Sequence, residues 1–231
     1  MAVFVYNEGL KIKHTLSRFP PVPPYDVVIM DDGSTDDSVQ YLRESNYPIL
    51  RHQTNRGVGN SIKTVVGYAR ENKYDILVLM AGNGKMQSSE IPALVEPIIN
   101  EDYDYVQGSR YLKTGRKENL PLFRDVMIKL FTFIVSIFTG YKGTDVTCGF
   151  RAYKLSILED PRINIWQDWL NKYEMEYYIH YKVLTLGYRI KEVPISMIYP
   201  QQKRGYSKIK PFLGWWSMVK PWILLTLRIK K

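Results

Sequence analysis

The chain has 231 residues, which is enough for one α/β domain with a short extension. Hydrophobic residues make up 45% of it, a content that supports a full core and excludes an intrinsically disordered chain. The single cysteine, Cys148, excludes an intramolecular disulfide and fits a reducing compartment. The three histidines, His14, His52 and His180, lack the clustered spacing of a structural zinc site.

The net charge of +9 is concentrated at the C-terminal end. No acidic residue follows Glu192, whereas eight basic residues do, so the body of the chain is close to neutral. A cationic segment of this kind suits nucleic acid, anionic lipid or a phosphorylated ligand. Phe212, Trp215, Trp216 and Trp222 lie among the basic residues, and this mixture favours a membrane surface over nucleic acid.

The first 108 residues alternate between two kinds of segment. Short apolar or β-branched runs predict strands at Ala2–Tyr6, Val27–Met30, Ile49–Arg51, Ile76–Met80 and Tyr105–Val106. Longer stretches between them predict helices at Leu10–Phe19, Asp36–Glu44, Gly59–Glu71 and Glu90–Asn100. This alternation predicts a Rossmann-like, mostly parallel α/β sheet flanked by helices, in which ligands bind at the carboxyl ends of the strands.

The second half of the chain is less regular. Its pattern predicts an amphipathic helix over Leu120–Gly140, a second helix over Tyr173–Leu186 and an edge strand over Tyr188–Pro194. We expect residues 1–200 to form the domain, and residues 201–231 to form a basic, aromatic tail with interfacial helices at a membrane surface.

Two apolar stretches bear on the membrane. Val126–Phe138 is interrupted by Lys129 and is shorter than the roughly 20 residues that cross a bilayer. Pro211–Ile229 is longer, but Lys220 and Pro221 occupy its middle, where a charge is costly. We interpret both as surface-lying segments, with a C-terminal span as the alternative. The first residues form a strand-like run, so we expect no secretory signal.

The second predicted strand is followed by Asp31, Asp32, Gly33 and Ser34. Carboxylates at the end of a strand can accept hydrogen bonds from a nucleotide base or ribose, and Gly33 permits a tight turn. The same residues also suit an ordinary turn that caps the next helix. The residue types alone leave both interpretations open.

Five ordered motifs resemble those of family 2 glycosyltransferases of the GT-A fold, in particular dolichyl-phosphate mannose synthases and related polyprenyl-phosphate sugar transferases. The motifs are Phe4-Val5-Tyr6-Asn7-Glu8, Val28–Ser34, Asn55–Asn60, Gln107–Tyr111 and Asp145–Arg151. The resemblance covers about the first 210 residues. It implies a hexosyltransferase that uses a nucleotide-diphosphate sugar.

The resemblance also implies roles for individual residues. Tyr6, Glu8, Asp31 and Asp32 match residues that hold the nucleotide base and ribose, with Gly33 in the turn that follows.

The resemblance implies roles for four further positions. Arg110 matches an arginine that faces the active site, and Arg124 matches one that grips the acceptor phosphate. Arg204 and Lys208 flank the end of an acceptor loop whose basic residues approach the pyrophosphate. The family pattern has an arginine three residues before the glycine of this loop, where this chain has Gln202.

The chain departs from the family after the fourth predicted strand. The family normally has Asp-X-Asp there, which holds Mg²⁺ or Mn²⁺ against the donor pyrophosphate, but this chain has Ala81-Gly82-Asn83. A single amide oxygen from Asn83 is a poor ligand for a hard divalent cation. Lys85 lies near the position of a further metal ligand, and its ammonium could neutralise pyrophosphate directly. Metal-independent transfer, a metal held by other groups and an inactive relative all remain open.

The resemblance therefore implies inverting transfer of a hexose, from GDP-mannose or UDP-glucose, to a polyprenyl or dolichyl phosphate. The place of action would be the cytoplasmic face of a membrane with anionic lipid, with the protein peripheral or monotopic. Asp145 is the candidate for a pocket carboxylate, with a local cap before Gly149 as its alternative. A glycan acceptor and a catalytically inactive nucleotide-sugar binder are the alternative functions.

Overall fold

The computed structural model describes residues 1–201 and 213–230, and this part of the chain contains a seven-stranded sheet in the order β3-β2-β1-β4-β7-β5-β8. The strands are β1 (Ala2–Val5), β2 (Val28–Asp31), β3 (Ile49–Arg51), β4 (Ile76–Ala81), β5 (Tyr105–Ser109), β7 (Arg151–Lys154) and β8 (Ile190–Pro194). β7 runs antiparallel to both of its neighbours, and every other pairing is parallel. A separate parallel pair joins β6 (Arg116–Glu118) to β9 (Ser196–Ile198).

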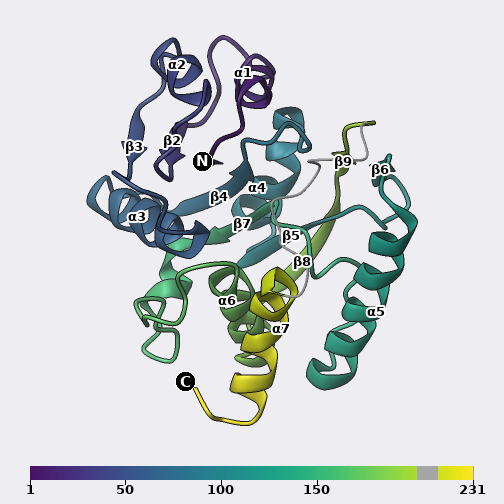
Figure 1. The fold of residues 1–231 in the computed structure, drawn as a ribbon. Coiled ribbons are helices and arrows are strands. Elements are labelled where there is room, and N and C mark those ends of the chain that lie inside the picture. Colours follow the sequence, from purple (N-terminus) through teal and green to yellow (C-terminus); the bar gives the residue numbers. More distant parts are fainter. Residues whose placement is uncertain (202–212, 231) are drawn as a thin grey trace.

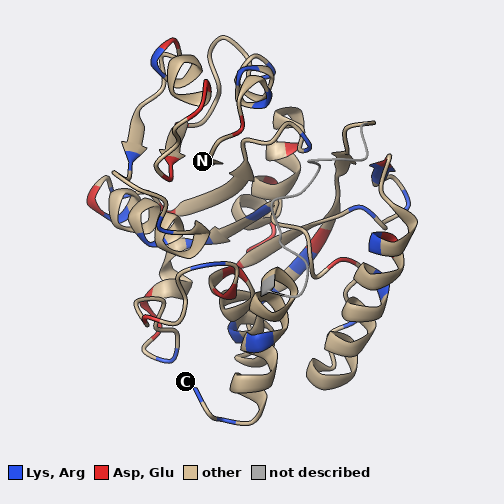
Figure 2. Ribbon diagram, viewed as in Figure 1, with Lys and Arg blue, Asp and Glu red and all other residues tan. Residues whose placement is uncertain are grey.

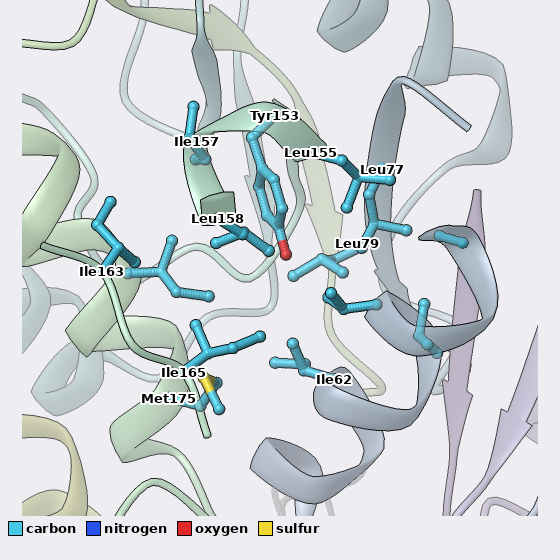
Figure 3. Close-up of a cluster of buried hydrophobic side chains, with 14 of the residues drawn as sticks. Ile62, Leu77, Leu79, Tyr153, Leu155, Ile157, Leu158, Ile163, Ile165 and Met175 are labelled. Atoms are coloured by element: carbon cyan, nitrogen blue, oxygen red, sulfur yellow. The ribbon is translucent and has the colours of Figure 1, made fainter. Parts of the chain in front are cut away.

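Helices cover both faces of the sheet because its central strands are apolar on both sides (Figure 1). The helices α1 (Leu10–Leu16), α2 (Ser38–Arg43) and α4 (Ile91–Asn100) cover one face, and α3 (Val58–Glu71) and α6 (Glu174–Thr185) cover the other. In β4, Val78 contributes to the first of these two cores, and Leu77 and Leu79 contribute to the second. Figure 3 shows the second core, where Ile62 of α3 and Met175 of α6 approach the strand side chains.

Two further helices, α5 (Leu122–Thr139) and α7 (Leu213–Thr226), extend from one end of the domain together with α6 (Figure 1). They meet in a small third core around Trp222, which is 7% exposed and contacts Phe131 of α5 and Tyr181 of α6 edge-on. Single turns of 3₁₀ helix lie at Ser88–Glu90 and Leu155–Glu159.

The structure confirms the predicted fold class of a mostly parallel α/β sheet flanked by helices. It also confirms Tyr188–Pro194 as an edge strand, since β8 lies at the end of the sheet. The antiparallel strand β7 and the β6–β9 pair were not predicted. The expectation that Trp222 lies at a membrane surface is wrong, because its ring packs in the third core.

Within the described ranges, the structure contains no helix of the length and hydrophobicity needed to cross a bilayer. The division into a domain over residues 1–200 and a tail over 201–231 stays a prediction. Arg204 and Lys208, together with Gln202, lie outside the described residues.

At Gly33 the turn after β2 approaches the loop after β3 closely. The φ of Gly33 is +76°, and a Cβ there would lie 2.5 Å from the backbone carbonyl carbon of Thr54. Gly140 has nearly the same φ, +72°, with no atom within 4 Å of its would-be Cβ. In urea unfolding, Gly140→Ala should cost about 1 kcal/mol from the backbone conformation alone, and Gly33→Ala about 3 kcal/mol or more because the clash adds to it. Equal losses would contradict the close approach of the two loops.

Candidate active site

The carboxyl ends of the parallel strands bring the polar residues of the motifs to one edge of the sheet. The candidate site residues at or just after these strand ends are Tyr6, Glu8, Asp31, Asp32, Asn83, Lys85 and Arg110. Because β7 runs in the opposite direction, the loop that precedes it reaches the same edge and adds Asp145.

The carboxylate of Asp32 holds the loop that follows β3. It accepts hydrogen bonds from the backbone N–H groups of Arg56 and Gly57, at 2.9 and 2.8 Å. His52 donates a third hydrogen bond to it from Nδ1, at 2.7 Å. Asp32 therefore accepts three hydrogen bonds within the protein, and these fix the shape of this side of the site.

Asp31 is also buried, but its two oxygens are used less completely. One oxygen, Oδ1, accepts a hydrogen bond from the backbone N–H of Ser34 at 2.9 Å. The other, Oδ2, lies 3.2 Å from Nε of Arg51 and accepts no hydrogen bond from the described residues. The turn interpretation of these residues from the sequence is therefore correct in part, and the second oxygen of Asp31 pairs with Arg51.

Tyr6 and Glu8 lie in the turn between β1 and α1. Tyr6 is 36% exposed at the rim of the site. Between them, the side chain of Asn7 accepts a hydrogen bond from the backbone N–H of Thr35 at 2.8 Å. The backbone N–H of Glu8 donates to Oγ of Ser38 at 2.8 Å, so the turn after β1 is tied to the start of α2.

The loop after β4 is held rigidly against α1. Thr15 donates from Oγ1 to the carbonyl of Gly82 at 3.2 Å, and Arg18 donates from Nη1 to the carbonyl of Gly84 at 2.8 Å. The carbonyl of Lys85 accepts a hydrogen bond from the backbone N–H of Ile198, the last residue of β9, at 3.0 Å. The loop therefore presents Lys85 from a fixed backbone.

Three cations meet around the ring of Tyr199. Nζ of Lys85 lies 5.0 Å from the ring centroid and the guanidinium carbon of Arg124 lies 5.7 Å from it. Nη1 of Arg110 donates to the Tyr199 hydroxyl at 2.7 Å. Lys85 is 7% exposed, and its burial, followed by the positive charge of Arg124, lowers its pKa to about 8, while Glu8 acts in the opposite direction. Concentrated positive charge beside an aromatic ring suits binding of a polyanion such as a diphosphate.

Arg110 is fixed by a buried ion pair with Asp145. Nε and Nη2 of Arg110 donate to the two carboxylate oxygens of Asp145 at 2.6 and 2.7 Å, and Asp145 is 0% exposed. Nη2 also donates to Oγ1 of Thr147 at 2.7 Å. Glu192 of β8 accepts hydrogen bonds from the backbone N–H groups of Thr144 and Asp145, at 2.8 to 3.0 Å. The Asp145 carboxylate thus orients Arg110, whose remaining nitrogen reaches Tyr199.

The residues after β4 do not fit a divalent metal. Ala81 and Gly82 carry no ligand atom, and the side-chain oxygen of Asn83 accepts a hydrogen bond from the backbone N–H of Lys85 at 3.3 Å. Across residues 1–201 and 213–230, no three or more His, Cys, Asp or Glu side chains are grouped so that they could hold a metal. Mg²⁺ and Mn²⁺ prefer several anionic oxygen ligands, and this loop offers an amide and an ammonium.

Tyr199 and Glu192 were not recognised from the sequence as site residues. Tyr199 follows β9, in a part of the chain outside the five motifs, and the end of a strand is the one signal that could have indicated it. Glu192 is an acidic residue within a predicted edge strand, which is an unusual place for a half-buried carboxylate. Both act on Arg110, one directly and one through Asp145.

The sequence of the chain matches a known protein family. The model for glycosyl transferase family 2 matches residues 2–161. An undecaprenyl-phosphate mannosyltransferase of Micrococcus luteus is 29% identical over 210 residues, which cover 88% of this chain and 84% of the relative. A UDP-N-acetylglucosamine–dolichyl-phosphate N-acetylglucosaminyltransferase of Methanococcus voltae is 30% identical over 67% of this chain and 68% of its own length.

The fold has a solved counterpart. Glucosyl-3-phosphoglycerate synthase from Mycobacterium tuberculosis, crystallised with Mn²⁺, UDP and glucosyl-3-phosphoglycerate, superimposes with a TM-score of 0.71. The match covers 100% of this chain and 80% of that one, at 15% sequence identity. The likeness shows that the two chains share the GT-A fold.

Removal of one partner of the buried ion pair between Arg110 and Asp145 should be costly. Asp145→Asn leaves the guanidinium buried without a counter-charge and should lower the free energy of unfolding by about 3–5 kcal/mol. The matched control is Asp102→Asn, which removes an exposed carboxylate that pairs with Lys154 and Arg189. Urea unfolding should separate the two variants clearly, with Asp102→Asn close to the parent protein. Similar midpoints for the two variants would mean that the buried Arg110 guanidinium does not need Asp145 as its counter-charge.

The lowered pKa of Lys85 should be visible as a pH dependence of stability. Between pH 8 and the ordinary lysine range, the unfolded chain holds a proton that the folded chain has released. The free energy of unfolding of the parent protein should therefore rise with pH in this window relative to Lys85→Met, by up to about 3 kcal/mol. Below pH 8 the difference between the two proteins should be constant. Lys13→Met, at an exposed lysine of α1, should run parallel to the parent throughout, and parallel curves for Lys85→Met would contradict the shift.

Proposed function

The chain belongs to glycosyl transferase family 2, and on that premise we propose that it transfers a hexose from a nucleotide-diphosphate sugar to a polyprenyl phosphate at a membrane surface. GDP-mannose and UDP-glucose are the proposed donors. The polyprenyl-phosphate acceptor is supported by the names of the two relatives, which act on undecaprenyl and dolichyl phosphate.

One observation carries the proposal: the cation Arg124, which faces the site, lies in the first turn of a helix with an apolar outer surface. The exposed apolar residues of α5 are Leu122, Phe123, Val126, Leu130, Phe133, Ile134, Ile137 and Phe138. A polyprenyl phosphate has the same arrangement, an anionic head on a long hydrocarbon chain. Its phosphate would bind Arg124 while its chain lies along α5 or in the bilayer beside it.

The donor would extend across the site from Asp31 and Asp32 to Lys85. We assign its nucleoside to the side with Tyr6, Glu8, Asp31 and Asp32, as the resemblance implies, and its diphosphate to Lys85. Arg110 would act through Tyr199, which it fixes beneath Lys85 and Arg124.

The proposed reaction is a single displacement. An oxygen of the acceptor phosphate forms a bond to the anomeric carbon while the bond from that carbon to the donor diphosphate breaks. The nucleoside diphosphate leaves with the electron pair, and the anomeric configuration inverts. Since a phosphate monoester is already anionic near neutral pH, the step needs no general base, and the protein contributes positioning and charge.

We further propose that α5 and α7 rest on the cytoplasmic face of a membrane that contains anionic lipid. Trp215 and Trp216 of α7 are exposed, and the ring of Trp215 stacks on Phe123 of α5 at 5.6 Å, so the two apolar surfaces adjoin. Figure 2 shows that the charges of α5 lie in its first half, and no charged residue follows Lys129 in that helix. Such a surface binds a bilayer interface, with basic residues near the anionic head groups.

The role of Arg124 can be tested with a short polyprenyl phosphate and each of the two donors. Arg124→Ala should raise the KM for the lipid phosphate at least about tenfold, because a charge-assisted contact is lost, and should leave the KM for the donor nearly unchanged. Arg124→Lys should restore activity in part, since a lysine makes no bidentate contact. Arg43→Ala, which removes an exposed arginine of α2, is the matched control and should behave as the parent.

Two outcomes would overturn the proposal. An unchanged KM for the lipid phosphate in Arg124→Ala would remove Arg124 from the acceptor site. Transfer to a glycan and not to lipid phosphate would identify the polysaccharide-type alternative, and binding of nucleotide sugar without turnover on any acceptor would identify an inactive relative.

A further inference from the structure

We propose that the ammonium of Lys85 binds the donor diphosphate directly, in place of the divalent cation that the resemblance implies, and that nucleotide binding is independent of metal. This inference rests on the proposed function for the identity of the donor. It concerns the loop after β4, which lies within the described residues.

The first argument is the chemistry of the loop. Ala81 and Gly82 offer no side-chain ligand, and the amide oxygen of Asn83 is turned back onto the backbone of its own loop. A Cβ at Gly82 would lie 2.8 Å from the side chain of Ile12 and 3.0 Å from that of Val5, so the loop is packed closely against β1 and α1. The loop therefore presents one cation, Lys85, and no anionic ligand for a metal.

The second argument is the charge around Lys85. Arg124 lies on the same Tyr199 ring, and the positive charges of Lys11 and Arg110 also act on the ammonium. Glu8 is the one acidic group among these influences. A divalent cation brought to this place would be repelled by several neighbours, whereas a diphosphate would be attracted by all of them except Glu8.

The third argument is that Lys85 is held in position by the protein. Its carbonyl accepts a hydrogen bond from the backbone N–H of Ile198, and the adjacent Gly84 carbonyl accepts one from Arg18. Its side chain is 7% exposed and lies over Tyr199, which Arg110 holds by its hydroxyl. A cation fixed in advance stabilises the charge that develops on the leaving diphosphate without reorganisation during the reaction.

The different roles that we assign to the two cations follow from their positions in the chain. Lys85 belongs to the strand-end loop on the donor side, and Arg124 belongs to the helix with the apolar outer surface. The two cations share the ring of Tyr199, so the donor diphosphate and the acceptor phosphate would be neutralised side by side. This arrangement brings together two anions that would otherwise repel each other.

Calorimetric titration of UDP and GDP in the presence of EDTA, and again in the presence of Mg²⁺, tests the proposal. The parent protein should bind the preferred nucleoside diphosphate with the same Kd, within about twofold, in both buffers. Lys85→Met should weaken that binding by about 10- to 100-fold and should leave binding of the corresponding nucleoside unchanged. Lys13→Met removes the same charge from the exposed side of α1 and should bind the diphosphate as the parent does.

A second variant reverses the substitution. Ala81→Asp combined with Asn83→Asp and Lys85→Gln introduces carboxylates in place of the ammonium. In this triple variant, Mg²⁺ should strengthen diphosphate binding tenfold or more, and Mn²⁺ titrated in the presence of UDP or GDP should bind. The parent protein should show neither effect.

Each outcome decides the inference. Tightening of the parent protein's binding by Mg²⁺ tenfold or more, or an unchanged Kd in Lys85→Met, would overturn it. Loss of nucleoside binding in Lys85→Met would show that the variant perturbs the whole site, and the triple variant would then decide by its response to Mg²⁺. Because none of these titrations contains a lipid, failure of lipid-phosphate transfer would overturn the proposed function alone.

Discussion

The arrangement of the site depends on one buried ion pair, that between Arg110 and Asp145. Glu192 fixes the backbone at Asp145, the Asp145 carboxylate orients Arg110, and Arg110 donates to the hydroxyl of Tyr199. The Tyr199 ring in turn lies beneath the cations that we assign to the two substrates. A buried pair of this kind is costly to desolvate and contributes little net stability as a pair. Its value here is geometric, because it fixes the ring on which the cations lie.

Much of the fold could be predicted because the apolar strands at the start of the chain are separated by helices and turn residues, a pattern with few alternatives. β7 was not predicted because the segment Arg151–Lys154 is short and begins and ends with a cation. In the structure its arginine is buried and donates hydrogen bonds to backbone carbonyls. Trp222 was misassigned because interleaved Trp and Lys indicate an interface only when the rings are unpacked, and α5 and α6 bury this ring of α7. The motifs located most of the candidate site residues, but hydrogen-bond partners come from tertiary structure. The links from Glu192 and Tyr199 to Arg110 therefore could not be inferred from spacing.

The departure from the family at Ala81–Asn83 has a local physical counterpart. A loop that holds a metal needs anionic ligands that point toward the ion. The charge of these ligands is then balanced by the bound ion. In this chain the loop ends in a lysine that is buried, lies over a tyrosine ring and accepts a backbone hydrogen bond from the last residue of β9. The same fold can thus present the fixed ammonium of a lysine at the strand end in place of a bound metal ion. The apolar surface of α5 begins immediately beside Arg124, the second cation of the site. This position connects the charged part of the site to a lipid-like surface.

The central claim is that the donor diphosphate is bound by Lys85 and not by a metal. Crystals grown with Mn²⁺ and whichever of UDP and GDP binds more tightly test it most directly, through anomalous scattering at the manganese edge. The account predicts phosphate oxygens within hydrogen-bonding distance of Nζ of Lys85, about 2.7–3.2 Å, and no anomalous peak beside them. A manganese peak between the phosphates and the Ala81–Asn83 loop, with Lys85 turned away, would contradict it.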